Sequence, residues 1–102
     1  IGRNYGPFDL VLLDTGQYNS AWKYSHMFPF ESVRAAKDLN SQFFMPIHWA
    51  GFTLSKHPWD EPIKKSIEYA EKEGMQYIAP MIGEIISNEE LNRNFVEWWN
   101  EY

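Results

Sequence analysis

Apolar residues gather in short blocks separated by polar turns, and two of these blocks predict strands. Residues 8–13 are almost continuously apolar after the turn residues Tyr5, Gly6 and Pro7, which is typical of a buried strand covered on both faces. Residues 43–47 form the second block. Because Pro46 cannot donate a ladder hydrogen bond, it marks an edge, a bulge or the end of that strand. Shorter strands are predicted over 77–79 and 82–86.

Three other segments have the spacing of helices. Pro29 suits the first turn of a helix that runs to Leu39. Asp60 is a candidate N-cap for a second helix, which Gly74 closes. The third helix is predicted at the C-terminus, after a sequence resembling a capping box over 87–90. Its apolar face consists of residues spaced i, i+4, i+7, i+8 and i+11: Leu91, Phe95, Trp98, Trp99 and Tyr102.

The resulting order, β-α-β-α-β-α, predicts an α/β fold. A strand, a crossover helix and a second strand of one sheet are almost always joined right-handedly, which makes 8–13 and 43–47 parallel. Their carboxyl ends then lie at one edge of the sheet, where open α/β sheets bind ligands.

Three side chains that can bind metal or transfer protons are predicted to meet at this edge. Asp14 ends the first strand, His26 precedes the first helix, and His48 ends the second strand. Imidazole and carboxylate are common zinc ligands. The sequence has no HxH, HxxH or HExxH motif and no Cys pair that would supply two ligands locally, so the chain is expected to offer only part of a metal site.

Each of these residues also has a structural interpretation. His48 is compatible with a core histidine that donates to a backbone carbonyl, and His26 with a polar residue flanking a helix. Asp14 before Thr-Gly is compatible with a turn former. His57, beside Pro58, is interpreted as a loop residue.

Composition narrows the classes of function. The 102 residues suffice for one domain, and a formal net charge of −5 makes nucleic acid an unfavoured partner. The absence of Cys excludes a disulfide framework and a thiolate zinc site. No transmembrane segment is predicted. The chain opens on Ile1 without an initiator Met, and we expect residues 1–102 to be a single fragment of a larger domain.

An ordered set of short motifs gives the chain a family resemblance. The segment 46–52, Pro-Ile-His-Trp-Ala-Gly-Phe, is followed by 57–62, His-Pro-Trp-Asp-Glu-Pro, and preceded by Gly-Pro-Phe-Asp-Leu at 6–10 and His26-Met27. These motifs resemble the C-terminal part of metallo-β-lactamase-fold hydrolases, in the branch that includes N-acyl-phosphatidylethanolamine phospholipase D. The resemblance implies the C-terminal half of an αββα sandwich.

The same resemblance implies roles for individual residues. His48 matches the last ligand of a dinuclear zinc site, and His26 matches a histidine near the substrate's phosphate or carbonyl oxygen. The remaining ligands, an HxHxDH cluster, a further His and a bridging Asp, would precede residue 1. We further expect Asp14, Tyr18 and Trp49 to contact substrate. Asp14 stands where many phospholipase-like members have Pro, which leaves its role open.

The function expected from these observations is that of a zinc-dependent hydrolase cleaving phosphodiester, ester or lactone bonds in small or lipid-like substrates. The isolated chain is expected to be inactive because it lacks the N-terminal half of its own domain, and its uncovered sheet is expected to drive self-association. The compartment expected is the cytoplasm, with the periplasm and a membrane-associated location left open.

Two alternatives remain at this stage. The first is a self-contained interaction domain that binds protein or carbohydrate through Trp22, Trp49, Trp98 and Trp99. The second is a complete small metalloenzyme that uses Asp14, His26 and His48 together.

Overall fold

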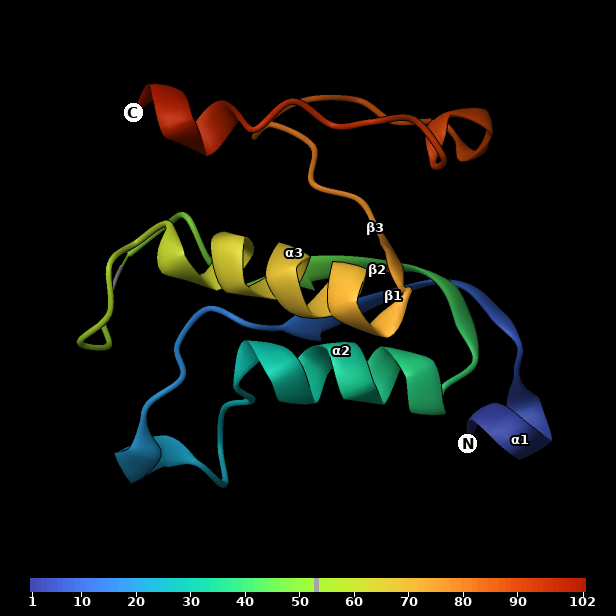
Figure 1. Cartoon of the computed structure of the whole chain (residues 1–102), viewed down its shortest axis with the longest axis horizontal. Helices are drawn as coiled ribbons and strands as arrows, with labels where there is room; N and C mark the ends of the chain where they lie inside the picture. The colour runs from blue at the N-terminus through green and yellow to red at the C-terminus, as the bar shows by residue number, and fades with distance from the viewer. Residues whose placement is uncertain (53) are drawn as a thin grey trace.

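A three-stranded parallel sheet organises the protein (Figure 1), whose computed structural model describes residues 1–52 and 54–102. The strands β1 (Phe8–Asp14), β2 (Ser41–Ile47) and β3 (Gln76–Tyr77) lie in that order, so β2 is central. In the parallel register Val11 pairs with Phe44 and Asp14 pairs with Ile47. The predicted α/β class and parallel strands are confirmed, and β1 and β2 end level at one edge.

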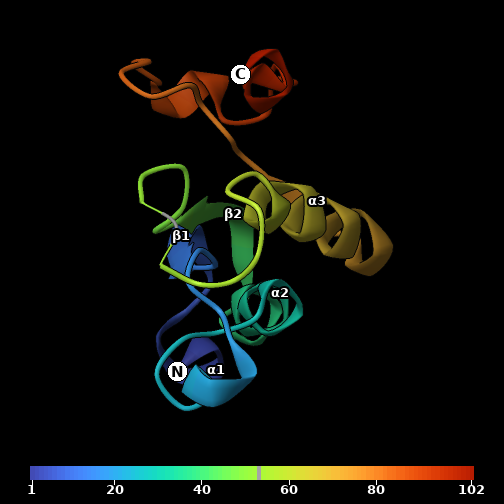
Figure 2. The same ribbon diagram turned by 90° about the vertical axis from the view of Figure 1, so that its left-hand side faces the viewer.

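Two helices form the crossovers between these strands. Helix α2 (Pro29–Asp38) leads from β1 to β2, and α3 (Glu61–Glu73) leads from β2 to β3. Both lie on the same side of the sheet (Figure 2). Gly74 ends α3 in the left-handed conformation, at φ 69°, as the sequence predicts. A short helix, α1 (Gly2–Tyr5), precedes β1.

The core lies between the sheet and these helices. One cluster joins α2, α3 and β2 and consists of Val33, Ala36, Phe44, Ala70 and Met75. A second cluster lies at the N-terminal half of α3 and includes Ile63, Ile67, Ala79, Trp98 and Trp99. Trp99 is 2% exposed, so the end of the chain is anchored in the core.

The opposite side of the sheet is less covered than the sequence suggests. Val11 and Leu13 pack toward the helices, so Leu12 points away from them, and it is 52% exposed. The prediction of a strand buried on both faces is therefore wrong for β1, which is an edge strand with β2 as its neighbour in the sheet. The predicted strand over 82–86 is also wrong, because these residues form a turn and extended chain in which Ile85 is 91% exposed.

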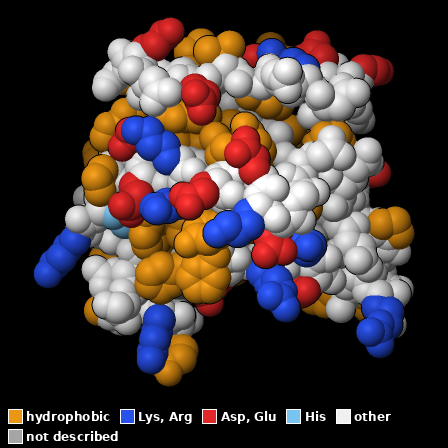
Figure 3. All heavy atoms as spheres, in the orientation of Figure 1, with side chains coloured by type: hydrophobic (Ala, Val, Ile, Leu, Met, Phe, Trp, Pro, Cys, Tyr) orange, Lys and Arg blue, Asp and Glu red, His pale blue; other side chains and the backbone are white. Residues whose placement is uncertain are grey.

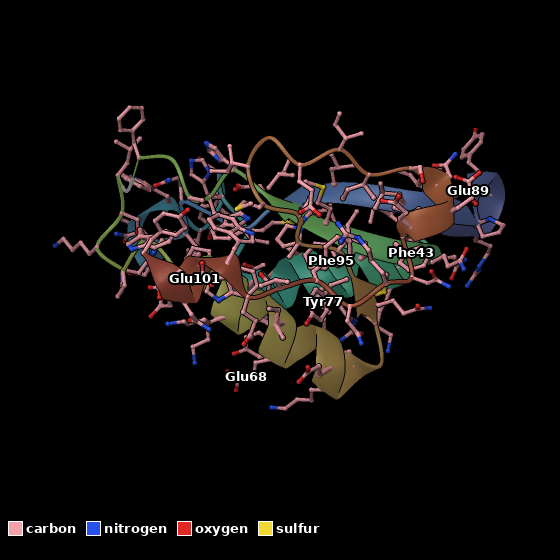
Figure 4. All side chains as sticks on the ribbon, turned by 90° about the horizontal axis from the view of Figure 1, so that it is seen from above. Phe43, Glu68, Tyr77, Glu89, Phe95 and Glu101 are labelled. Atoms are coloured by element: carbon pink, nitrogen blue, oxygen red, sulfur yellow. The ribbon has the colours of Figure 1, made fainter. Side chains whose placement is uncertain are left out.

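The predicted C-terminal helix is wrong as well. Two 3-10 turns, η2 (Asn88–Glu90) and η3 (Trp98–Glu101), are separated by irregular chain. Seen from above, this segment runs along α3, with Phe95 beside Tyr77 (Figure 4). Phe95, Trp98 and Trp99 pack in the second core cluster, and Leu91 and Phe95 line a groove with Glu71 and Met75. These tertiary contacts accompany an irregular path in place of the predicted helix.

In the part of the chain that the structure describes, no helix has the length and apolar character needed to cross a membrane.

Candidate metal and substrate site

Asp14, His26 and His48 meet at the carboxyl edge of β1 and β2. The Asp14 Oδ2 atom lies 3.0 Å from His26 Nδ1, and Oδ1 lies 3.0 Å from His48 Nδ1. The two imidazole rings are 5.6 Å apart between centroids. All three side chains offer a possible ligand atom within 4.8 Å of the others. The parallel strand order thus brings together the residues singled out from the sequence.

The cluster is accessible to solvent. The side chain of His48 is 54% exposed, that of His26 29% and that of Asp14 24%. His48 is therefore not a core histidine, and its Nδ1 contacts a carboxylate in place of a backbone carbonyl. Partial burial opposes ionisation of Asp14, but hydrogen bonds from His26, the Gly16 amide and His48 outweigh it and hold the pKa of this carboxyl below its usual value.

The turn after β1 fixes the position of Asp14. The Gly16 amide donates to Asp14 Oδ1 at 3.2 Å, and the Ser32 hydroxyl of α2 donates to the Asp14 carbonyl. Thr15 continues the ladder by donating its amide to the Ile47 carbonyl at 3.1 Å. The turn former expected from Asp-Thr-Gly is present, and the same aspartate also serves both histidines.

Close packing between two turns fixes the position of His48. A Cβ on Gly16 would lie 1.4 Å from the His48 carbonyl oxygen, so the turn after β1 touches the backbone after β2. His48 itself has φ 68°, in the left-handed region that a non-glycine residue adopts at a cost of about 1–3 kcal/mol. In this backbone conformation the His48 imidazole faces the carboxyl end of β1, where its Nδ1 contacts Asp14.

Side-chain contacts join the loops that follow β1 and β2. Gln17, which is 5% exposed, donates to the Phe52 carbonyl at 2.6 Å and accepts from the Leu54 amide at 3.0 Å. Tyr18 donates its hydroxyl to Glu61, and burial together with this acceptor raises the Tyr18 pKa. These contacts could not be predicted from local sequence patterns because they join residues 35 to 43 positions apart.

Trp49 lies beside His48 and faces a hollow. Its Nε1 donates to the Pro46 carbonyl at 3.0 Å, and its ring stacks on that of Trp98 at 5.4 Å. The hollow has a volume of about 300 Å³ and is lined by Trp49, His48, Met45 and Ile82 among others. It provides a mainly apolar surface next to the histidine cluster.

A larger groove lies elsewhere, between α2 and α3. Phe30 and Tyr69 line it together with charged residues such as Arg34, Lys72 and Glu73. Hydrophobic side chains framed by charged ones are visible on this helix-covered face in Figure 3. None of the cluster residues lines this groove, so it is separate from the candidate site.

The donor set fits zinc, but incompletely. Two imidazoles and a carboxylate are suitable ligand types, and zinc takes three or four protein ligands. Here both Nδ1 atoms face Asp14, which leaves one Nε2 on each ring for another contact. The described part of the chain thus brings two imidazoles and one carboxylate together at this edge of the sheet.

The part of the chain that contains this cluster matches a known protein family. Residues 1–49 match the family model of the beta-lactamase superfamily domain. The resemblance predicted from the sequence motifs is thereby confirmed. This match includes Asp14, His26 and His48.

Curated proteins from several organisms are similar to the chain. Uncharacterized proteins of Mycobacterium tuberculosis and Mycobacterium bovis are 44% identical over 87 residues, covering 82% of this chain and 23% of theirs. Outer membrane protein RomA of Klebsiella pneumoniae is 46% identical over 48 residues, or 47% of this chain and 36% of RomA. A mitochondrial N-acyl-phosphatidylethanolamine-hydrolyzing phospholipase D of Saccharomyces cerevisiae is 36% identical over 69 residues, covering 66% of this chain and 15% of the enzyme. The chain spans about a quarter of the length of the mycobacterial relatives.

The interaction-domain alternative loses part of its surface in the structure. Trp98 is 7% exposed and Trp99 is 2% exposed, because both pack in the second core cluster. Trp22 is 38% exposed and lies near His26, at 5.9 Å between ring centroids. The C-terminal tryptophans therefore act as core residues.

Proposed function

We propose that this chain is the C-terminal portion of a zinc-dependent hydrolase of the beta-lactamase superfamily. The observation that carries the proposal is the cluster of Asp14, His26 and His48, which lies within the sequence matched to the superfamily. It occupies the sheet edge at which α/β proteins bind ligands.

His48 is the proposed metal ligand, through Nε2. Its Nδ1 faces Asp14, so Nε2 is the ring nitrogen left for a metal. One histidine cannot hold zinc, and the other ligands of a dinuclear site are proposed to come from sequence before residue 1. Zinc, when bound in such a site, lowers the pKa of a coordinated water to about 7 and so supplies hydroxide at neutral pH.

His26 is proposed to contact the substrate. Its Nδ1 faces the Asp14 carboxylate, which leaves Nε2 for the substrate, and a ring nitrogen that carries a hydrogen donates a hydrogen bond. Such a donor stabilises negative charge that develops on a phosphate or carbonyl oxygen. Trp49 is proposed to contact the rest of the substrate from the wall of the adjoining hollow. Because the Tyr18 hydroxyl is bound to Glu61, a substrate contact by Tyr18 would use its ring.

The proposed substrates are phosphodiesters, carboxylic esters or lactones with an apolar or lipid-like group. The name of the yeast relative, an N-acyl-phosphatidylethanolamine-hydrolyzing phospholipase D, supports the phosphodiester class. The mainly apolar lining of the hollow beside His48 supports an apolar group next to the reacting bond.

Self-association of the isolated chain is part of the proposal. Leu12 pairs with Met45 on the side of the sheet away from the helices, and Ile82, 74% exposed, lies near Met45. An apolar surface of this kind favours contact with a second copy. Sedimentation at micromolar concentration is expected to show a dimer or larger species, and a monomer alone would contradict the expectation.

The activity is tested by comparing this chain with the protein encoded by its whole open reading frame. With added zinc, the longer protein is expected to hydrolyse bis(p-nitrophenyl) phosphate or p-nitrophenyl acetate, and the 102-residue chain is expected to be inactive. Hydrolysis and tight stoichiometric zinc binding by the 102-residue chain would favour the complete small metalloenzyme instead. No hydrolysis of either ester by the longer protein would contradict the proposed reaction class.

A further inference from the structure

Asp14 contacts both histidines of the cluster with different oxygens. Oδ2 faces His26 Nδ1 and Oδ1 faces His48 Nδ1, each at 3.0 Å. These are ordinary hydrogen-bond lengths. The two histidines lie in different loops, so the one carboxylate links the chain before α2 to the chain after β2.

The chemistry of a carboxylate decides where the ring protons lie. An ionised aspartate accepts hydrogen bonds and donates none, so each facing Nδ1 carries a hydrogen. A neutral imidazole has one N–H, so its Nε2 then has a free lone pair. If His26 takes a second proton on Nε2, its Nδ1–H still donates to Asp14.

We infer that Asp14 is a positioning residue that fixes the tautomer of both His26 and His48 and directs both Nε2 atoms away from the strand end. The tautomers follow from contacts within this chain alone. Their use in holding metal and substrate rests on the proposed function.

The surroundings of Asp14 suit this positioning role. Its backbone carbonyl accepts from Ser32, and its Oδ1 also accepts from the Gly16 amide at 3.2 Å. Contacts with the turn and with α2 therefore hold Asp14 in place independently of the two histidines. A rigid acceptor orients a metal-binding histidine and raises the basicity of its other nitrogen.

This role differs from the substrate contact expected for Asp14 from sequence. Both carboxylate oxygens already face ring nitrogens, and Oδ1 accepts a further amide. A substrate contact would have to displace one of these partners. A positioning residue acts through the histidines and changes their protonation pattern in the absence of any substrate.

The test is NMR spectroscopy of the metal-free chain labelled with ¹⁵N in its histidines. Two-bond proton–nitrogen correlations distinguish an imidazole protonated on Nδ1 from one protonated on Nε2. The chain has three histidines, and single His→Gln variants assign their signals. His57 is an internal reference, because its Nδ1 lies 2.9 Å from the Pro58 carbonyl and far along the chain from Asp14.

In the wild-type chain above the pH at which the rings become doubly protonated, His26 and His48 are both expected to carry the hydrogen on Nδ1. Asp14→Asn retains one accepting oxygen but places a donating NH₂ opposite the other ring. One of the two rings is therefore expected to shift its hydrogen to Nε2, and His57 is expected to stay unchanged. Asp9→Asn, at an exposed carboxylate of the same strand, is the matched control and should change none of the rings.

Nε2–H tautomers in the wild-type chain, or unchanged tautomers in a folded Asp14→Asn variant, would overturn the inference. Circular dichroism confirms that each variant is folded, and if Asp14→Asn unfolds, the wild-type spectrum alone decides. Calorimetric zinc titration of the protein encoded by the whole open reading frame supplies the second readout, with an expected loss of about 10- to 100-fold in affinity for Asp14→Asn. Absence of zinc binding in every variant of this longer protein, with the predicted tautomers present, would count against the proposed metal site and leave the positioning role standing.

Discussion

The contact between Gly16 and the His48 backbone provides the sharpest mutational test of how the site is held together. In Gly16→Ala, the new Cβ would lie 1.4 Å from the His48 carbonyl oxygen, 2.2 Å from its carbonyl carbon and 2.8 Å from the Trp49 amide nitrogen. All three atoms belong to the backbone, so no side-chain rotation relieves the overlap. The two turns must separate.

The size of the effect follows from the depth of this overlap. Overpacking in protein interiors costs about 1–3 kcal/mol and occasionally more. Because the obstacle at Gly16 is backbone, we expect Gly16→Ala to lower the free energy of unfolding by about 3 kcal/mol or more. For a domain of this size, such a loss lowers the midpoint of thermal unfolding by roughly 12 °C or more.

The assay is thermal and urea unfolding followed by circular dichroism, with Gly51→Ala as the matched control. Gly51 lies in the loop that follows β2, and a Cβ there would meet nothing within 4 Å. Its substitution is expected to change stability by no more than about 0.5 kcal/mol. If Gly16→Ala were as stable as Gly51→Ala, the account of the two turns as a fixed contact would be refuted.

Three further predictions concern the core and the C-terminal segment. Ser66 is 1% exposed and its hydroxyl has no partner among the described residues, so Ser66→Ala should leave the free energy of unfolding unchanged or raise it. Ser32→Ala removes the donor to the Asp14 carbonyl and should cost about 1–3 kcal/mol in urea unfolding. Trp99→Ala should cost about 3–5 kcal/mol in the same assay, and a loss below about 1 kcal/mol would contradict its place in the core. The hydrogen bond from Arg93 holds the pKa of Glu84 below its ordinary value of 4.5, so its stabilising effect is present above that pH and lost as pH falls through the lowered pKa. The difference in thermal midpoint between wild type and Glu84→Gln should accordingly vanish in acid, and a difference that persists there would contradict the assignment.

The parts of the fold that the sequence predicts correctly are those governed by local rules. Pro29 and Gly74 mark the start of α2 and the end of α3, because proline fits a first turn and glycine adopts the left-handed conformation. The apolar runs locate β1 and β2, and crossover geometry makes them parallel. From these rules alone, Asp14, His26 and His48 can be placed at one edge.

The C-terminal segment shows where local rules fail. The spacing of Leu91, Phe95 and Trp98 matches a helix, but Phe95 and Trp98 pack in the second core cluster, and Leu91 lines a groove with Glu71 and Met75. Tertiary contacts therefore outweigh periodicity. Arg93 also bonds Glu84 and lies over the Phe95 ring at 4.5 Å, which further holds this irregular conformation.

The Asp14 contacts were not predictable from sequence for a different reason. An aspartate before Thr-Gly has the same sequence signature whether it forms only a turn or also binds two histidines. The distinction depends on the left-handed backbone at His48 and on the close approach of Gly16, and both join positions more than 30 residues apart. Sequence motifs located the ligand types, and the fold determined which atoms face one another.

The most direct test of the central claim is the zinc content of the protein encoded by the whole open reading frame, measured by mass spectrometry after gel filtration. His48→Ala is compared with His57→Ala, which removes a histidine outside the cluster. The account predicts that the wild type and His57→Ala retain zinc and that His48→Ala loses part of it. Equal zinc in all three proteins would contradict the assignment of His48 as a ligand.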